Sequence, residues 1–314
     1  MAKCSYCGSS AGWFSAEHPG CRERVEGGLA AVRRVFAGYL TRDPEAAGVI
    51  GALRRELAHL TAAARLPNEQ VREELAQEWA STVREVVDAA LPSRGRVHQL
   101  RTFATAFSLT TDSAHARDAD SRLERAFVLR RCVEGDLPEW RGPSPFTLRR
   151  REQLVWMLND VRYFEDRAPR VTDRRSGSIP AALATYGGEP SADAARGIYL
   201  GAAAFGSTSK SWALNDPVSA YVDAGTLGLT TSHIHFHSPR HSVRVAYGEL
   251  ADLSPYRNAL VVARTAAGTL PQALAVNAAA DAWFVYNLAA NLARRAGNEI
   301  DDPSGEVQGE RSVA

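Results

Sequence analysis

Hydrophobic residues recur every three or four positions through the first half of the chain, which is the spacing of amphipathic helices. Residues 30–40 carry Val32, Phe36 and Tyr39 on one such face, and Thr41-Arg42-Asp43-Pro44 ends that helix. A second stripe follows from Ile50 to Leu60. The same pattern predicts further helices in three places: after Pro67 as far as Leu91-Pro92, around 100–109, and around 123–133. Residues 29–145 are therefore predicted to form a helical domain.

A change of composition marks the end of this helical region. Pro138 and the run Gly142-Pro143-Ser144-Pro145 are typical of a boundary. Beyond it, the spacing of Leu154, Leu158 and Val161 predicts one more helix over 146–166. Residues 168–196 are rich in Gly, Pro, Ser and Ala without periodicity, so 146–196 is interpreted as a helix followed by a linker.

Short apolar or alternating runs replace the helical stripes after residue 197, and they predict β-strands. These runs are Gly197–Ala203, Ser211–Leu214, Val218–Asp223, His233–Phe236, Val243–Tyr247, Ala259–Ala263 and Gln272–Val276. One amphipathic helix, Ala279–Arg295, follows them. Seven short strands and a terminal helix favour a bent sheet or small barrel covered by that helix over 197–297, with a disordered tail at 298–314.

The cysteines add a third part to this α+β chain. Cys4, Cys7, His18 and Cys21 are spaced C-x2-C-x10-H-x2-C within the first 21 residues. Two close pairs of soft ligands are what a tetrahedral zinc ion needs, and four protein ligands leave no position for a substrate. The pattern predicts a zinc finger over 1–28 that holds one structural Zn2+.

The finger resembles short treble-clef-like zinc fingers of bacterial proteins, in which a C-x2-C-G knuckle precedes an aromatic-Ser pair and H-x2-C. The matching residues, besides the four ligands, are Gly8, Phe14 and Ser15. The resemblance implies a metal-binding role and covers less than a tenth of the chain.

A second resemblance lies in the predicted β region, which is similar to the GRAM and bacterial PH-like superfamily. An Asp-x-Gly-x-Leu-x-Leu-Thr hairpin, a following aromatic strand and a later apolar strand ending in Arg carry it. The positions that fit are Asp223, Gly225, Thr226, Leu229, Thr230, Phe236, Tyr247, Leu250 and Arg264. The resemblance implies a PH-like β-barrel capped by a helix, which binds a protein partner or a membrane surface.

Histidines at alternate positions form the most chemically suggestive cluster. His233, His235 and His237 would share one face of a strand, with His241 four residues further on, and such a ladder could hold a transition metal. The alternative interpretation places Ile234 and Phe236 in the core and the histidines in solvent. We favour the second interpretation and predict no catalytic residue here.

Charge and composition favour no single partner class. The net charge is +1 and the hydrophobic fraction is 45%, as in an ordinary globular protein. Lys3 and Lys210 are the only lysines, and basic clusters occur at 149–151 and 174–175. No phosphate-binding glycine loop and no nucleophile elbow are present in the sequence.

These patterns together predict a cytoplasmic, non-enzymatic zinc-binding adaptor whose PH-like module binds a protein partner or a membrane surface. A nucleic-acid- or ribosome-associated zinc-finger protein is one alternative. A metal-dependent enzyme that uses His233, His235 and His237 is the other.

Overall fold

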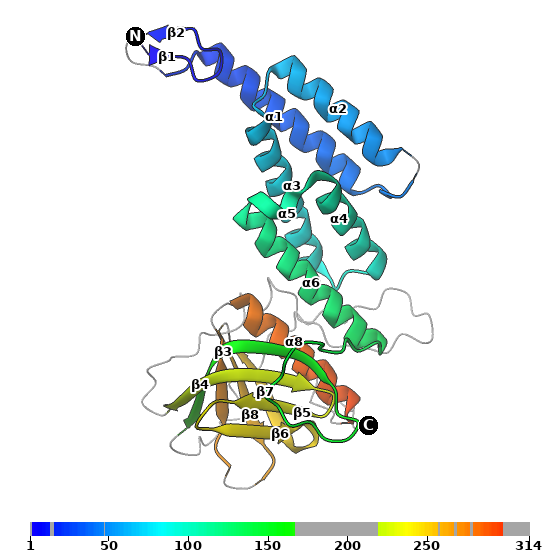
Figure 1. The fold of residues 1–314 in the computed structure, drawn as a ribbon, viewed down its shortest axis with the longest axis vertical. Helices are drawn as coiled ribbons and strands as arrows, with labels where there is room; N and C mark the ends of the chain where they lie inside the picture. The colour runs from blue at the N-terminus through cyan, green and yellow to red at the C-terminus, as the bar shows by residue number, and fades with distance from the viewer. Residues whose placement is uncertain are drawn as a thin grey trace, which may run out of the picture. The chain divides into compact units, whose positions relative to one another are not determined.

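A computed structural model describes residues 2–12, 16–46, 48–166, 219–256, 258–266, 269–276 and 279–297. Their contacts divide the chain into two compact units. The first comprises residues 1–86 and 92–124, and the second comprises 87–91 and 125–314. Helices dominate the first unit and an antiparallel sheet dominates the second (Figure 1).

The chain begins with a small hairpin and continues as helices. The hairpin pairs β1 (Ala2–Lys3) with β2 (Ser10–Gly12). The helices are α1 (Pro19–Leu40), α2 (Val49–Ala64), α3 (Asn68–Ala89), α4 (Arg94–Phe107), α5 (Leu109–Asp112) and α6 (Ala114–Glu134). The hydrophobic stripes of the sequence therefore become helices, and α3 begins directly after Pro67 as expected.

Aromatic side chains form the centre of the first unit. Phe36 of α1 is fully buried and meets Phe103 of α4 edge to face, with ring centroids 6.3 Å apart. Trp79 of α3 is also fully buried, and its indole N–H donates to the backbone carbonyl of Leu100 at 2.9 Å. This bond satisfies the one polar atom of the indole, so the ring can be buried without an energetic penalty.

The second unit is built on a seven-stranded antiparallel sheet with the order β6-β5-β4-β3-β9-β8-β7. Its strands are β3 (Leu154–Asp166), β4 (Ser219–Thr230), β5 (His233–His237), β6 (Ser242–Ala246), β7 (Leu250–Tyr256), β8 (Ala259–Arg264) and β9 (Gln272–Ala275). The 3-10 turn η1 (Tyr247–Glu249) joins β6 to β7, and α8 (Ala279–Arg295) follows the last strand. The sequence pattern predicted the bounds of α8 correctly.

The sheet is not closed into a barrel, which corrects the expected PH-like β-barrel but not the alternative of a bent sheet. Among the described residues, β6 pairs with β5 and β7 pairs with β8, so these two strands are the edges. Helix α8 packs on β7, β8, β4 and η1. It covers one face of the sheet, and Phe284 of α8 contacts Trp156 of β3 with ring centroids 4.8 Å apart.

The helix predicted over 146–166 is wrong, because Leu154–Asp166 is the central strand β3. Its pairing with β4 is interrupted at three places, between Leu154 and Trp156, between Leu158 and Val161, and between Tyr163 and Phe164. Asp160, inside the second interruption, has a φ of 59°. These irregularities break the simple alternation of a strand and leave apolar residues at a spacing that imitates a helix.

Both faces of β5 are buried, which corrects the expectation that its histidines face solvent. His233, Ile234, His235 and Phe236 are all between 2% and 5% exposed. Phe236 stacks on Tyr163 of β3 with ring centroids 5.0 Å apart. The core position of Phe236 is as predicted, but the histidine face also lies inside the protein.

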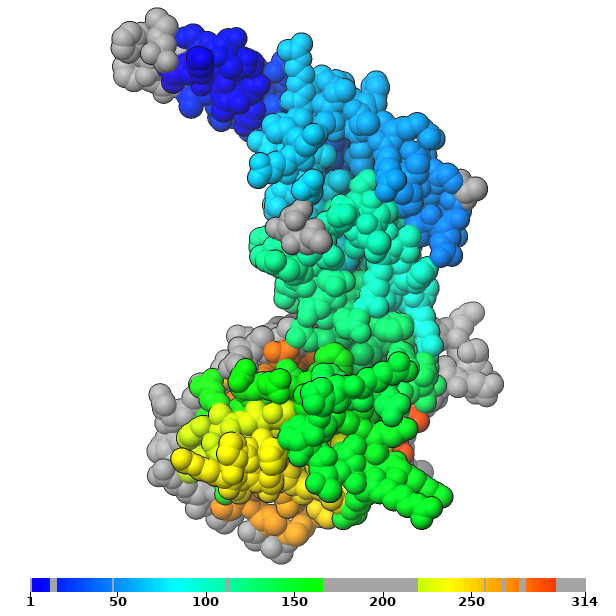
Figure 2. Space-filling view, in the orientation of Figure 1, coloured from blue at the N-terminus to red at the C-terminus, as the bar shows by residue number. Residues whose placement is uncertain are grey.

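Two glycines of β4 allow close approaches that any side chain would block. A Cβ at Gly225 would lie 2.1 Å from the carbonyl oxygen of His237. At Gly228 it would lie 2.4 Å from the ring of Phe146. Figure 2 shows the segment that leads into β3, in green, beside the yellow strands β4 to β6. Gly228 therefore makes room for this segment on the histidine face of the sheet.

Several expectations fall on residues that the structure does not describe. These are the linker at 168–196, the strands Gly197–Ala203 and Ser211–Leu214, the tail at 298–314, and Phe14 and Ser15. Among the described helices, none combines the length and hydrophobicity that crossing a membrane requires.

Phe236→Ala should destabilise the second unit by about 3–5 kcal/mol, because a buried ring leaves a cavity when it is removed. Arg240→Ala, at an exposed position of the same hairpin, should change the stability by no more than about 0.5 kcal/mol. Denaturant unfolding of the full chain measures both. Equal effects of the two substitutions would contradict a buried Phe236.

Candidate metal centres

The four ligands predicted from the sequence lie together at the N-terminus. The Sγ atoms of Cys4, Cys7 and Cys21 and a ring nitrogen of His18 are all within 4.8 Å of one another. Nδ1 of His18 is 3.4 Å from Sγ of Cys7 and 3.7 Å from Sγ of Cys21. The group therefore lies close enough to hold a metal ion.

Short-range backbone contacts bring these four side chains together. Cys4 and Cys7 occupy a tight turn in which the Gly8 N–H donates to the Cys4 carbonyl at 2.9 Å. Gly8 has a φ of 73°, a conformation that glycine adopts without strain. The second pair lies at the start of α1, where His18 is the N-cap and Cys21 falls in the first turn. A turn and a helix start are both local, which explains why sequence spacing alone predicted the group.

The protonation of His18 is fixed by its second ring nitrogen. Nε2 lies 2.9 Å from the backbone carbonyl oxygen of Ser10, which can only accept a hydrogen bond. Nε2 must therefore carry the proton, and in the neutral ring Nδ1 keeps its lone pair on the side of the cysteines. Histidine ligands of metals commonly make this type of outer hydrogen bond, which orients the ring.

The spacing of the ligand atoms fits a tetrahedral ion. Zinc bonds of about 2.3 Å to sulfur and 2.05 Å to nitrogen place adjacent ligand atoms about 3.55 Å apart at the tetrahedral angle. The two distances from His18 Nδ1 to sulfur, 3.4 and 3.7 Å, lie on either side of that value. The donor set of three thiols and one imidazole suits zinc better than a hard cation.

The acidity of Cys4 is in keeping with a metal-binding thiol. Burial opposes its ionisation, but hydrogen bonds from backbone N–H groups, that of His18 foremost, outweigh burial and lower its pKa to about 6. By contrast, burial raises the pKa of Cys132 to about 11. Cys132 lies outside the group, so it serves as an internal comparison.

A second group of ligand-type residues, which sequence analysis missed, lies in the sheet unit. Glu152, His233 and His235 place one carboxylate oxygen and two ring nitrogens within 4.8 Å of one another, and all three residues are buried. Oε1 of Glu152 is 2.8 Å from Nδ1 of His233 and 2.9 Å from Nε2 of His235. Glu152 is 81 residues from His233 along the chain, so no local spacing could have joined them.

Hydrogen bonds around Thr230 hold this second group in place. Its hydroxyl donates to Oε1 of Glu152 at 2.6 Å and accepts the His233 N–H at 2.8 Å. The hydroxyl of Tyr247 in turn donates to the Thr230 carbonyl. Phe146 covers the group from the side, with its ring centroid 5.3 Å from that of His235. These contacts tie the turn before β3 to the hairpin of β4 and β5.

The charge of Glu152 is set by these donors. Burial raises the pKa of its carboxyl, but hydrogen bonds from Thr230, the Arg149 N–H and the two imidazoles prevail and lower it to about 2. Burial lowers the pKa of His235, although Glu152 opposes this effect. At neutral pH the carboxylate is ionised and accepts from both rings.

His237, the third member of the predicted ladder, and the nearby His241 do not join Glu152. Nδ1 of His237 is 2.9 Å from the Ser242 hydroxyl, and the ring is partly exposed. His241 stacks on Tyr163, with centroids 5.1 Å apart. The structure thus replaces a ladder of three histidines by two histidines and a glutamate from another part of the chain.

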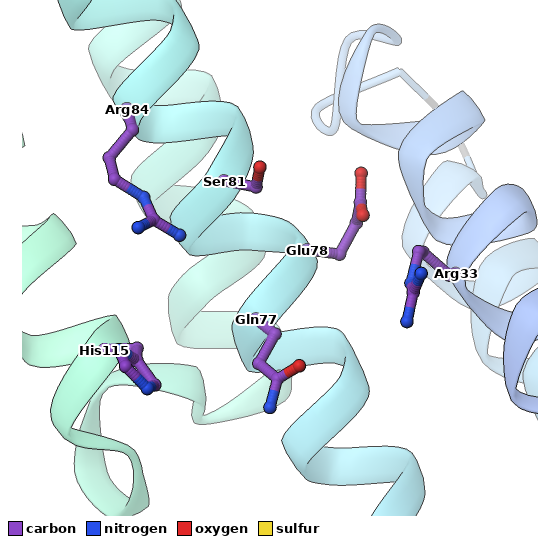
Figure 3. Close-up of a pocket in the computed structure, with 6 residues that line it drawn as sticks. All are labelled: Arg33, Gln77, Glu78, Ser81, Arg84 and His115. Carbon is purple, nitrogen blue, oxygen red and sulfur yellow. The ribbon is translucent and has the colours of Figure 1, made fainter. Parts of the chain in front are cut away.

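Two grooves in the helical unit have polar linings. One has a volume of about 420 Å³ and runs along α3, with Arg33 of α1 on one side and His115 of α6 on the other (Figure 3). Arg33 also forms an ion pair with Glu74, and burial raises the pKa of Glu78. The other groove, of about 700 Å³, is lined by Glu69, Gln70, Arg72, Glu73, Ala76, Leu109 and Ser113. Small-molecule sites are mostly apolar, whereas both grooves are lined mainly by polar and charged residues.

Only one of the two basic clusters lies among the described residues. Residues 149–151 are exposed, but they form a turn before β3 where the sequence predicted a helix. Residues 174–175 lie outside the described residues.

Comparison with known proteins found no matching family model, curated protein or solved structure. The resemblances to treble-clef-like fingers and to the PH-like superfamily therefore stay predictions, while the metal-binding geometry rests on the structure itself.

Purified protein should contain one tightly bound zinc ion in the N-terminal group, and Cys4→Ser or Cys21→Ser should release it, because each removes one of four ligands. Elemental analysis after dialysis measures this. Cys132→Ser is the matched control, since it makes the same chemical change outside the group and should leave that zinc in place. Retention of the zinc by both ligand variants would contradict the assignment.

Glu152→Gln should alter the pH dependence of stability. The carboxyl pKa falls from an ordinary 4.5 to about 2 on folding, so its contribution is fully present above pH 4.5 and is lost as the pH falls through 2. The contribution amounts to about 3 kcal/mol at most. Unfolding with EDTA present should show the largest difference between wild type and variant near pH 6, and little difference near pH 2.

The exposed Glu249→Gln is the control for this experiment and should follow the wild type at every pH. A difference between wild type and Glu152→Gln that stays constant with pH would show that the carboxylate charge is not involved.

Proposed function

We propose that the chain is a non-enzymatic zinc-binding adaptor that assembles with a protein partner. The closed N-terminal group carries this proposal, because three cysteines and one histidine take all four positions of a tetrahedral ion. A catalytic zinc needs an open position for water or substrate. The ion therefore serves to fix the β1–β2 hairpin on the start of α1, and its role is structural.

The polar grooves of the helical unit support a binding role. Arg33, Glu78 and Arg84 give one groove charges of both signs, which suits a polar segment of another protein better than an apolar small molecule.

The sheet unit supplies a second surface for binding. Helix α8 supports the sheet, so the turns between strands are held on a rigid base, as in many binding modules. Pro255 and Asp252 lie in the edge strand β7, and such residues discourage uncontrolled pairing with other strands. A protein partner is favoured over a membrane because the net charge is +1 and only two lysines are present. We propose a cytoplasmic location because three of the four cysteines lie together in the N-terminal group and the fourth, Cys132, is alone, which does not suit a disulfide framework.

Affinity capture of the tagged full-length chain from its native cells, followed by mass spectrometry, tests the adaptor. We expect a stoichiometric protein partner that survives washing. Comparison of the Cys4→Ser variant with the Cys132→Ser control locates the contact with the partner. Loss of the partner in Cys4→Ser alone indicates that the partner binds at the finger. Retention of the partner by both variants indicates that it binds elsewhere. Absence of any stoichiometric protein would contradict the proposal.

Flotation with vesicles that contain anionic lipid tests the membrane alternative. We expect little of the full chain to float, because the charge is nearly balanced. Strong flotation that weakens as salt rises would replace the protein partner by a membrane surface, since screening weakens electrostatic binding.

A further inference from the structure

The buried group of Glu152, His233 and His235 is chemically distinct from the finger and independent of it. His233 and His235 are two residues apart on β5, so their side chains share one face of the strand. Glu152 reaches the same face from the turn before β3. Two imidazoles and one carboxylate, each less than 10% exposed, thus converge in the interior of the sheet unit.

The charges of this group are unbalanced when both rings are neutral. Within the described structure, the ion pairs of Glu152 are formed only with the two histidines, and the side chains of Arg, Lys or the N-terminus take no part. A buried carboxylate without a formal positive charge is costly unless hydrogen bonds compensate for it. A divalent cation at this place would neutralise the carboxylate directly.

We propose that Glu152, His233 and His235 form a second metal site, which binds a borderline divalent ion such as Zn2+ through one oxygen and two nitrogens. Nitrogen and carboxylate ligands suit such ions, whereas a hard ion such as Ca2+ prefers six or more oxygens. The Thr230 hydroxyl already binds both Glu152 and the His233 N–H, so the described side chains supply three ligands.

Metal binding lengthens the contacts between Glu152 and the two rings. The distances of 2.8 and 2.9 Å from Glu152 Oε1 to the two rings are those of hydrogen bonds. Metal bonds of about 2.0 Å would place these atoms about 3.3 Å apart at the tetrahedral angle. Each distance from Oε1 to a ring nitrogen must therefore lengthen by about half an ångström to admit an ion, and Glu152 stands on a turn outside the regular strand.

The protons also rearrange without net gain or loss. In the hydrogen-bonded form, His233 Nδ1 and His235 Nε2 carry protons and donate to the carboxylate. Metal binding requires the lone pairs of these same nitrogens, so each neutral ring moves its proton to its other nitrogen. The carboxylate exchanges two N–H donors for one metal bond.

The experiment loads the full chain with Co2+ in place of zinc, dialyses away loose metal, and combines elemental analysis with absorption spectra. Wild type should hold two equivalents. One should show the thiolate-to-cobalt charge-transfer bands of the finger, and the other should lack them because its ligands are oxygen and nitrogen. Cys4→Ser should remove the charge-transfer bands and keep the second equivalent.

Two variants test the second site, and one serves as a control. Glu152→Gln keeps the shape and hydrogen-bonding capacity of the side chain but weakens it as a ligand, and His235→Ala removes a ligand. Both should lose the second equivalent and keep the charge-transfer bands, with affinity at that site falling at least about tenfold. His237→Ala changes the neighbouring histidine, which binds Ser242, and should keep both equivalents.

Circular dichroism verifies that each variant is folded, and if His235→Ala does not fold, Glu152→Gln decides the result. A single equivalent in wild type would overturn the second site. Retention of two equivalents in Glu152→Gln would do the same, as would loss of the second equivalent in His237→Ala. Failure of the finger would remove the charge-transfer bands instead, so the two sites are judged separately.

Discussion

The pairing of β3 with its two neighbours is the interaction on which the second unit depends. Strand β3 pairs with β4 on one side and with β9 on the other, and it thereby joins β4-β5-β6 to β9-β8-β7. Trp156 of β3 contacts Phe284 of α8, and Tyr163 of β3 stacks on Phe236 of β5. Without this strand, the described sheet would separate into two sets of three. The turn before β3 also carries Glu152, so the same strand that joins the sheet also positions the buried carboxylate.

The sequence predicted those parts of the structure whose information is local. The stripes of α1 to α4 and the bounds of α8 could be identified because each helix repeats its own apolar spacing. The N-terminal ligand group could be identified because its four residues lie within eighteen consecutive residues, 4–21. By contrast, β3 was mistaken for a helix because three interruptions in its pairing with β4 disturb the alternation. Glu152 was missed because no sequence pattern near position 152 indicates a contact with two histidines more than eighty residues away.

The two ligand groups differ in the distances between their ligand atoms. In the N-terminal group, His18 Nδ1 lies 3.4 and 3.7 Å from two sulfur atoms, which are distances that suit an ion between them. In the sheet, oxygen and nitrogen are 2.8 and 2.9 Å apart, and each contact is satisfied in the absence of metal. We therefore expect an ion to stabilise the first group, whereas the second, as proposed, can alternate between a hydrogen-bonded form and a metal-bound form.

The contact between Glu152 and β5 also has a consequence for how the sheet assembles. Successive residues of a strand point to opposite faces, so a slip of β5 by one residue would exchange its two faces. His233 and His235 would then leave Glu152, and Ile234 would take the place of a hydrogen-bond donor beside a buried charge. Because both faces of β5 are buried, hydrophobicity alone distinguishes the two registers poorly. The Glu152 carboxylate distinguishes the two registers, because the slipped register would leave this buried charge without its two imidazole donors. The native register of β5 is therefore favoured during folding.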